Sequence, residues 1–157
     1  MSATDRVAAA LAAAGVEPEL REFPQGTRTA ADAAAAIGCE VGQICKSLVF
    51  RIGPDGAPLL VITSGSNRVD EARVGALVGG TLGKADADFV REHTGYAIGG
   101  VPPLGHAAPL ATIFDEDLLR YDVVWAAAGT PMSVFPVAPA VLVEATGAHV
   151  APVSPAG

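Results

Sequence analysis

The sequence predicts an α+β fold on a mixed sheet, in a single domain spanning residues 1–157. The first observation is a hairpin pattern, in which apolar runs at 43–52 and 58–63 flank a Gly-Pro-Asp-Gly turn at 53–56. The second is the irregular alternation of helix and strand signals along the chain, which indicates neither a parallel α/β repeat nor an all-β protein. The third is composition: half of the 157 residues are apolar and 17% are charged, enough for a substantial core and too few charges for disorder.

In the first half of the chain, helix caps and turn residues separate short elements. Residues 5–14 predict a helix that stops at a glycine, and residues 19–23 predict an extended segment between two prolines. Thr29 is a cap-like residue with an acid at the third helical position after it, and Gly38 closes the helix that it opens. The predicted hairpin follows.

The second half continues the alternation. Residues 70–78 and 86–93 predict helices that begin at an aspartate and stop at a glycine. Apolar runs predict strands at 111–114, 123–128 and 131–137, with a turn or short helix at 115–120 and a last helix near 139–145. With one Trp, two Tyr and five Phe, we expect the core to be aliphatic.

Charge and cysteine content limit the partners and the compartment. The net charge of −7 argues against strong nonspecific nucleic-acid binding, including DNA binding. No run of 18 apolar residues occurs, and the Ala-rich start lacks signal-peptide order, so we expect no membrane span and a cytoplasmic location. Cys39 and Cys45 have no further cysteine partners, which favours reduced thiols. Any RNA-facing surface should use the basic residues of the first half: Arg21, Arg28, Lys46, Arg51, Arg68 and Arg73.

Lys46 is the first candidate for chemistry. In a strand, period-two alternation places it on the same face as Ile44, Leu48 and Phe50. A cation among apolar side chains needs a partner, a cavity or a lowered pKa, which marks a functional site. The alternative is a lysine near a strand end whose ammonium reaches water.

The segment 99–105 is the second candidate, since it holds three glycines and two prolines in seven residues. Such a loop can direct backbone N–H groups at a carbonyl oxygen or an oxyanion. The alternative is an ordinary rigid turn.

Other reactive residues have weaker patterns. Adjacent strand residues point to opposite faces, so Lys46 is badly placed to activate Cys45, which we expect to be a buried core residue. The three histidines lack metal-ligand spacing, and no metal or cofactor is expected. Ser64-Gly65-Ser66 follows a strand without forming a GxSxG elbow, and residues 66–70 either line a site or start a helix. The acids at 115–117 most simply cap a short helix.

The order of these features resembles the YbaK/prolyl-tRNA synthetase-associated editing-domain family. The similarity lies in six blocks that together span about 100 residues, at 27–34, 42–50, 64–70, 99–106, 113–119 and 127–131. The resemblance implies a strongly curved mixed sheet flanked by helices, with the site in a cleft between them. It also implies a freestanding hydrolase of mischarged tRNA, acting on tRNA(Pro) that carries a small noncognate residue, Cys or Ala.

The resemblance also assigns site residues. Lys46 matches the family's essential lysine, and Gly100 and Pro103 match its GxxP loop. Substrate contacts are expected from other residues of the matched blocks: Arg28, Thr29, Ser47, Ser64, Gly65, Val101, Pro102 and Gly129. One departure is visible at 139–142, where Val141 stands in a position that is acidic in many members.

The expected chemistry needs no protein nucleophile. An aminoacyl ester is already activated, so its hydrolysis requires an oriented attacking group and stabilisation of the developing oxyanion. Water, positioned in part by the ribose 2′-hydroxyl, or the thiol of a cysteinyl substrate can attack. Aminoacyl-tRNA, bound with modest intrinsic affinity, and prolyl-tRNA synthetase are the expected partners. Two alternatives stay open, a noncatalytic binding module for aminoacyl-adenylate-like ligands and a synthetase-associated adaptor.

Overall fold

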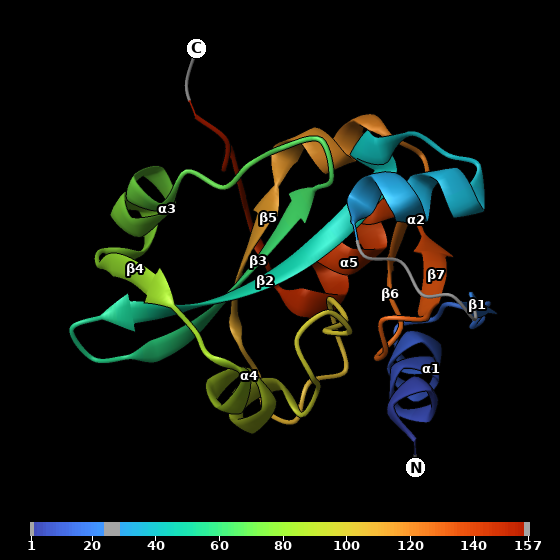
Figure 1. The fold of residues 1–157 in the computed structure, drawn as a ribbon, viewed down its shortest axis with the longest axis horizontal. Coiled ribbons are helices and arrows are strands. Elements are labelled where there is room, and N and C mark those ends of the chain that lie inside the picture. Colours follow the sequence, from blue (N-terminus) through green and yellow to red (C-terminus); the bar gives the residue numbers. More distant parts are fainter. Residues whose placement is uncertain (1, 24–28, 156–157) are drawn as a thin grey trace.

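Helices and strands interleave around one mixed sheet (Figure 1), which confirms the predicted α+β class. The computed structural model describes residues 2–23 and 29–155. The strands are β1 (Arg21–Glu22), β2 (Ile44–Gly53), β3 (Ala57–Ser64), β4 (Thr81–Lys84), β5 (Ala111–Asp115), β6 (Val124–Ala127), β7 (Ser133–Val137) and β8 (His149–Ala151). The helices are α1 (Ala3–Ala13), α2 (Ala30–Ile37), α3 (Glu71–Val78), α4 (Ala87–Thr94) and α5 (Pro139–Thr146), with short 3-10 helices η1 (Val41–Gln43) and η2 (Glu116–Arg120).

The sheet runs in the order β1-β7-β6-β2-β3-β5-β8, and β4 pairs with part of β2. β2 and β3 form the predicted antiparallel hairpin, with Cys45 opposite Ser64 and Ile52 opposite Ala57. The pairs β2–β6, β3–β5 and β5–β8 are parallel and the other pairs are antiparallel, so the sheet is mixed. β1 and β8 end the order without meeting, so the sheet is not closed.

Most predicted helix boundaries are set by the expected caps. The side chains of Thr29, Asp70 and Asp86 each accept a hydrogen bond from the third residue of the helix that follows. α2, α3 and α4 each end at a glycine with positive φ, as predicted. α1 begins earlier than predicted, because Ser2 and Asp5 form a reciprocal capping box.

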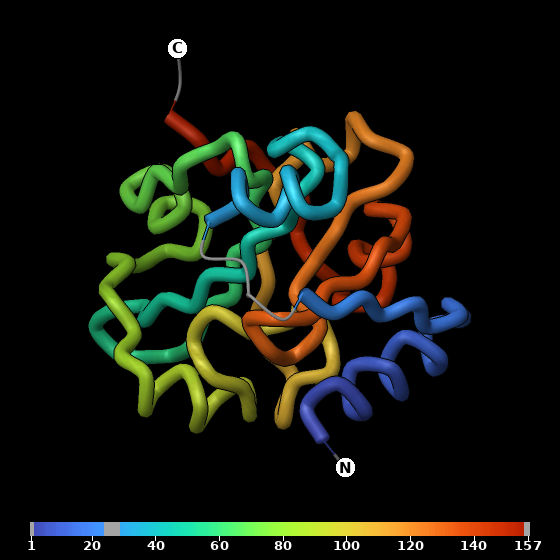
Figure 2. Tube along the Cα trace, turned by 45° about the vertical axis from the view of Figure 1, so that its right-hand side comes forward, coloured from blue at the N-terminus to red at the C-terminus, as the bar shows by residue number. Residues whose placement is uncertain are grey.

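The core is divided by the sheet, and β3 is buried on both faces. Leu60 and Ile62 belong to a cluster that also contains Val7 and Leu11 of α1, while Leu59 and Val61 pack on the opposite side against α3. A third cluster joins two alanines of α2 to Ile44, Trp125 and Val134. The core is largely aliphatic, although Phe114 and Phe135 are its largest fully buried side chains. In Figure 1, α1 lies beside β1 and β7, and Figures 1 and 2 both show α3 beside β4.

Two strands and one strand boundary also differ from the sequence predictions. β4 and β8 were not predicted, because both are short and gain their strand conformation from pairing with β2 and β5. β7 begins at Ser133 and not at 131, because Ser133 N donates to Thr130 O in a turn that precedes the strand.

Within the described part of the chain, no helix is both long and apolar enough to cross a bilayer.

Candidate active site

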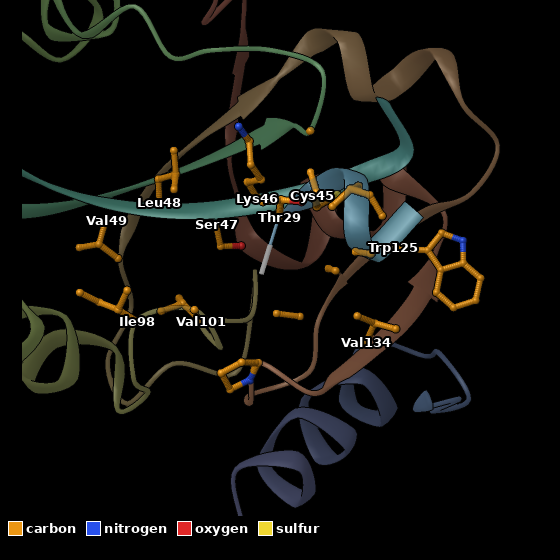
Figure 3. Close-up of a pocket in the computed structure, with 18 of the residues that line it drawn as sticks. Thr29, Cys45, Lys46, Ser47, Leu48, Val49, Ile98, Val101, Trp125 and Val134 are labelled. Atoms are coloured by element: carbon orange, nitrogen blue, oxygen red, sulfur yellow. The ribbon is translucent and has the colours of Figure 1, made fainter. Parts of the chain in front are cut away.

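A cavity of about 910 Å³ opens along β2 (Figure 3). Its walls come from β2, α2, the chain around Ile98–Val101 and the segment that joins β6 to β7. Most of the lining is apolar. The polar side chains that line it are Thr29, Lys46, Ser47, Lys84, Thr130 and Ser133.

The cavity lies where β2 changes partners. β6 pairs with β2 at Ile44 and Cys45, and β4 pairs with it from Phe50 to Gly53. Between these two pairings, residues 46–49 are paired with β3 alone among the described strands. We call residues 46–49 the open edge of β2, and all four line the cavity.

Lys46 and its neighbours alternate as the strand period predicts. Figure 3 shows Lys46 and Leu48 on one side of β2, while Ser47 and Val49 point to the other side, toward Ile98 and Val101. The Lys46 ammonium donates a 3.1 Å hydrogen bond to the backbone oxygen of Asn67. The lysine therefore has a partner at the carboxyl end of β3, and its ammonium does not face the 99–105 loop in this conformation.

Asn67 is itself held by two carboxylates. Its side-chain nitrogen donates 2.8 Å hydrogen bonds to Asp115 and Asp117, so both amide hydrogens are used. Asp115 is only 1% exposed, and the same carboxylate oxygen also accepts from Thr63 Oγ1 and Ser64 N, each at 3.0 Å. The acids at 115–117 thus do more than the predicted capping. Asp115 does cap η2 through a bond from Asp117 N, and its other oxygen fixes the segment that carries Lys46's partner.

The 99–105 loop is rigid and closely packed. A Cβ on Gly100 would lie 2.7 Å from Thr130 Cα, so the chain after β6 approaches the loop too closely for any larger residue. The Tyr96 hydroxyl donates to Gly105 O at 2.7 Å, and His106 Nε2 donates to Pro102 O at 2.7 Å. Burial lowers the pKa of His106, which favours the neutral ring that makes this bond.

Three of the four residues at 100–103 offer no free amide to a ligand. Gly100 N donates to Ala97 O at 3.1 Å, and Pro102 and Pro103 have no N–H. Within 100–103, all of which the structure describes, Val101 is therefore the residue whose amide remains for an oxyanion. Val101 also lines the cavity, whereas Gly100, Pro102 and Pro103 are not part of its lining.

Of the remaining candidate residues, Cys45 and Ser64 have structural roles, whereas Ser47 has a hydroxyl that a ligand could bind. Cys45 is buried, and burial raises the pKa of its thiol far above the neutral range, so it is the core residue that the sequence predicts. Ser64 Oγ donates to Gly42 O at 2.7 Å in a buried position. Ser47 differs, because its buried hydroxyl has no hydrogen-bond partner within the part of the chain that the structure describes.

The predicted site residues thus separate into three groups. Thr29, Lys46, Ser47, Gly65 and Val101 line the cavity. Ser64, Gly100, Pro102, Pro103 and Gly129 are not part of its lining and support the segments around it. Arg28 lies outside the described residues. Val141, the departure from the family pattern, is in the first turn of α5 and packs against the core, away from the lining.

Several cavity residues were not predicted as site residues. Lys84 reaches the cavity because β4 pairs with β2, and β4 itself was not predicted. Trp125 lines it from β6, with Arg21 stacked on its ring at 4.7 Å from the centroid. The only feature of the sequence that could have pointed to Trp125 as a site residue is that it is the one tryptophan of the chain. Asn67 and Asp115, which hold the Lys46 ammonium without lining the cavity, are within matched blocks, but their contact depends on a pairing between distant strands.

Proteins of known sequence resemble this chain over most of its length. The model of the aminoacyl-tRNA editing domain family matches residues 24–145. The Bacillus subtilis protein YwhH, described as uncharacterized, is 31% identical over 128 residues, covering 82% of this chain and 81% of that protein. A proline–tRNA ligase of Limosilactobacillus fermentum is 29% identical over 109 residues, which are 66% of this chain and 19% of the ligase.

A solved structure supports the fold over its full length. The crystal structure of a protein described as a candidate trans-editing enzyme for prolyl tRNA synthetase is 48% identical, with a TM-score of 0.92 and 99% of each chain covered. The family match covers most of the chain, and this structure shares its mixed sheet and helices. The chain belongs to the aminoacyl-tRNA editing domain family.

Proposed function

We propose that the protein is a trans-editing hydrolase that deacylates mischarged tRNA, with tRNA(Pro) carrying Cys or Ala as its substrate. The observation that carries the proposal is the position of Lys46, at a cavity on the open edge of β2, in a chain of the editing family. Similarity to a proline–tRNA ligase and to a trans-editing protein for prolyl tRNA synthetase supports tRNA(Pro).

The cavity holds two groups that can bind the polar parts of an aminoacyl ester. The Lys46 ammonium supplies positive charge for the ribose, the phosphate or the developing oxyanion. Val101, which Figure 3 shows on the side of β2 to which Ser47 and Val49 point, supplies a backbone N–H donor. The attacking group comes from water or from the substrate, because the buried Cys45 thiol is protonated.

Selectivity for a small residue requires help from outside the cavity. At about 910 Å³ the cavity has room for a terminal nucleoside and an amino acid together. An apolar pocket separates near-isosteres by only about 10- to 200-fold per methylene. We therefore propose that the tRNA body, or a prolyl-tRNA synthetase that holds it, supplies part of the selectivity.

The test is a deacylation panel. Purified protein is incubated with tRNA(Pro) charged separately with Cys, Ala, Ser and Pro, and release of the amino acid is followed against the spontaneous rate. Release of Cys or Ala that Lys46→Ala abolishes, with Pro-tRNA(Pro) left intact, supports the proposal. Survival of every noncognate ester would overturn it.

One observation favours a second candidate, a binding module without catalysis. Gly100 N–H is already bonded within its loop, and the Lys46 ammonium is held by Asn67 O away from that loop. Calorimetry with an alanyl-adenylate analogue distinguishes the two. Tight binding without turnover of Ala-tRNA(Pro) supports the module, and turnover excludes it.

A further inference from the structure

The open edge of β2 holds unpaired backbone groups beside the cavity. Gly65 N donates to Ile44 O and Gly56 N donates to Ile52 O, both at 2.7 Å, so the even-numbered residues of β2 face β3. Because strand residues direct their N–H and C=O groups to alternate sides, Ser47 and Val49 direct theirs away from β3, into the gap between β6 and β4. No described residue pairs with them there.

The gap fits a short ligand and excludes a long one. Four residues of strand extend over roughly 13 Å at about 3.3 Å each. β6 closes one end of the gap at Cys45, and β4 closes the other at Phe50. A strand from a second copy or from a long peptide would collide with these ends, whereas one residue-sized group can enter.

An α-aminoacyl group carries the hydrogen-bond donor and acceptor that would pair with the backbone groups of the open edge. In an extended amino acid residue, the nitrogen and the carbonyl oxygen lie on the same side, as in one residue of a β-strand. Opposite a single edge residue, the ammonium can donate to its C=O and the acyl oxygen can accept from its N–H. Ser47 is the better placed partner, because it adjoins Lys46 and its buried hydroxyl is also without a described partner. A buried polar group without a hydrogen bond raises the free energy of the folded protein, and a ligand that supplies the hydrogen bond would lower it again.

We infer that the open edge binds the L-aminoacyl group as a one-residue strand, with Ser47 C=O accepting from the α-ammonium and Ser47 N–H donating to the acyl oxygen. This inference rests on the proposed function for the identity of the ligand. It assigns recognition of the amino group to main chain. The edge would thus accept any L-amino acid that the cavity's side chains admit, and would discriminate against acyl groups without an amino nitrogen.

The test uses two non-hydrolysable probes, 3′-deoxy-3′-(L-alanylamino)adenosine and its L-lactyl counterpart, which carries a hydroxyl in place of the ammonium. Binding of each to the full chain is measured by calorimetry, and backbone amides are followed by NMR. We expect the alanyl probe to bind at least tenfold more tightly, since a hydrogen bond from a charged donor is stronger than one from a neutral hydroxyl. We also expect it to slow hydrogen exchange at the Ser47 amide, while the Leu48 amide, already bonded to β3, does not change.

A matched variant separates main chain from side chain. In Ser47→Ala, the alanyl-over-lactyl preference should survive, because the backbone reads the ammonium. Equal affinities of the two probes, loss of the preference in Ser47→Ala, protection at Val49 in place of Ser47, or no binding at millimolar probe would each overturn the inference. Failure of the proposed function looks different: the probe would protect Ser47 while the protein left every aminoacyl ester intact. If the protein turns over Ala-tRNA(Pro) while the Ser47 amide is unaffected by the probe, the proposed function is supported. The inference that the open edge binds the aminoacyl group is then refuted.

Discussion

Lys46 depends on a segment that is distant from it in sequence. Its ammonium donates a 3.1 Å hydrogen bond to Asn67 O, and the Asn67 side chain donates in turn to Asp115 and Asp117. This chain of contacts gives the cation a partner on the side of β2 that it shares with Leu48.

Asn67 should therefore matter through Lys46. Asn67→Ala removes the bonds to Asp115 and Asp117, and the carbonyl that holds Lys46 loses its anchor. We expect kcat/KM on Ala-tRNA(Pro) to fall about tenfold and stability to fall by about 1–3 kcal/mol. In a protein that already carries Lys46→Met, Asn67→Ala should lower stability by a similar amount. It should leave the remaining rate of deacylation unaltered, which a double-mutant cycle measures.

Thr146→Val is the control for this cycle. It deletes another side-chain hydrogen bond, from Thr146 Oγ1 to Leu142 O in α5, outside the cavity lining. It should lower the unfolding free energy without changing kcat/KM. Equal activity losses from Asn67→Ala with and without Lys46 would show that Asn67 acts only on stability.

His106 predicts a pH dependence of stability. Burial lowers its pKa below the ordinary 6.5 in the folded protein. The unfolded chain therefore binds the proton more readily between the two values. The stability that neutral His106 contributes is complete above about pH 6.5. It is lost as the pH falls through the pKa that His106 has in the folded protein. Denaturant unfolding from pH 7.5 to 5 should show wild type losing more stability than His106→Gln, which keeps a donor for Pro102 O. Parallel losses would show that other groups cause the dependence.

At the scale of elements, the cavity depends on the contact between two loops. Gly100 meets Thr130 and Gly129 backbone atoms, which cannot move aside as a flexible side chain can. Gly100→Ala should therefore displace one loop, lower stability by roughly 1–3 kcal/mol and reduce deacylation. Gly83→Ala on β4 is the matched control, because nothing lies within 4 Å of the added Cβ. Thermal unfolding and initial rates of both variants check the difference, and similar values for the two would contradict a tight contact.

Elements with strong local signals could be predicted, and those that depend on partners could not. The caps Thr29, Asp70 and Asp86 and the glycines after α2, α3 and α4 define helices from residues adjacent in sequence. β4 and β8 have three or four residues each and are strands because β2 and β5 are beside them. The same limit applies to the site. Lys46 and the 99–105 loop have local signals, whereas the open edge exists only because β6 leaves β2 before β4 joins it.

At the scale of the whole molecule, the net charge of −7 predicts weak contact with the tRNA body. Lys46 and Lys84 are the cations that line the cavity in the part of the chain the structure describes. Two contacts to single-stranded phosphates give a slope of about −1.4 for log(1/KM) against log salt, near −0.7 per contact. Lys84→Ala should reduce the slope by about one contact and leave kcat unchanged. A steep slope in wild type would indicate a phosphate-binding surface elsewhere.

The most direct measurement is single-turnover release of alanine from Ala-tRNA(Pro) with enzyme in excess, comparing wild type with Lys46→Met, a side chain of similar length without charge. We expect first-order release well above the spontaneous rate in wild type. In Lys46→Met we expect the rate to fall at least a hundredfold, equivalent to about 2.7 kcal/mol of transition-state stabilisation, with the unfolding temperature little changed. Wild-type release at the spontaneous rate for both Ala- and Cys-tRNA(Pro), or full activity in Lys46→Met, would contradict the proposed role of Lys46 in deacylation.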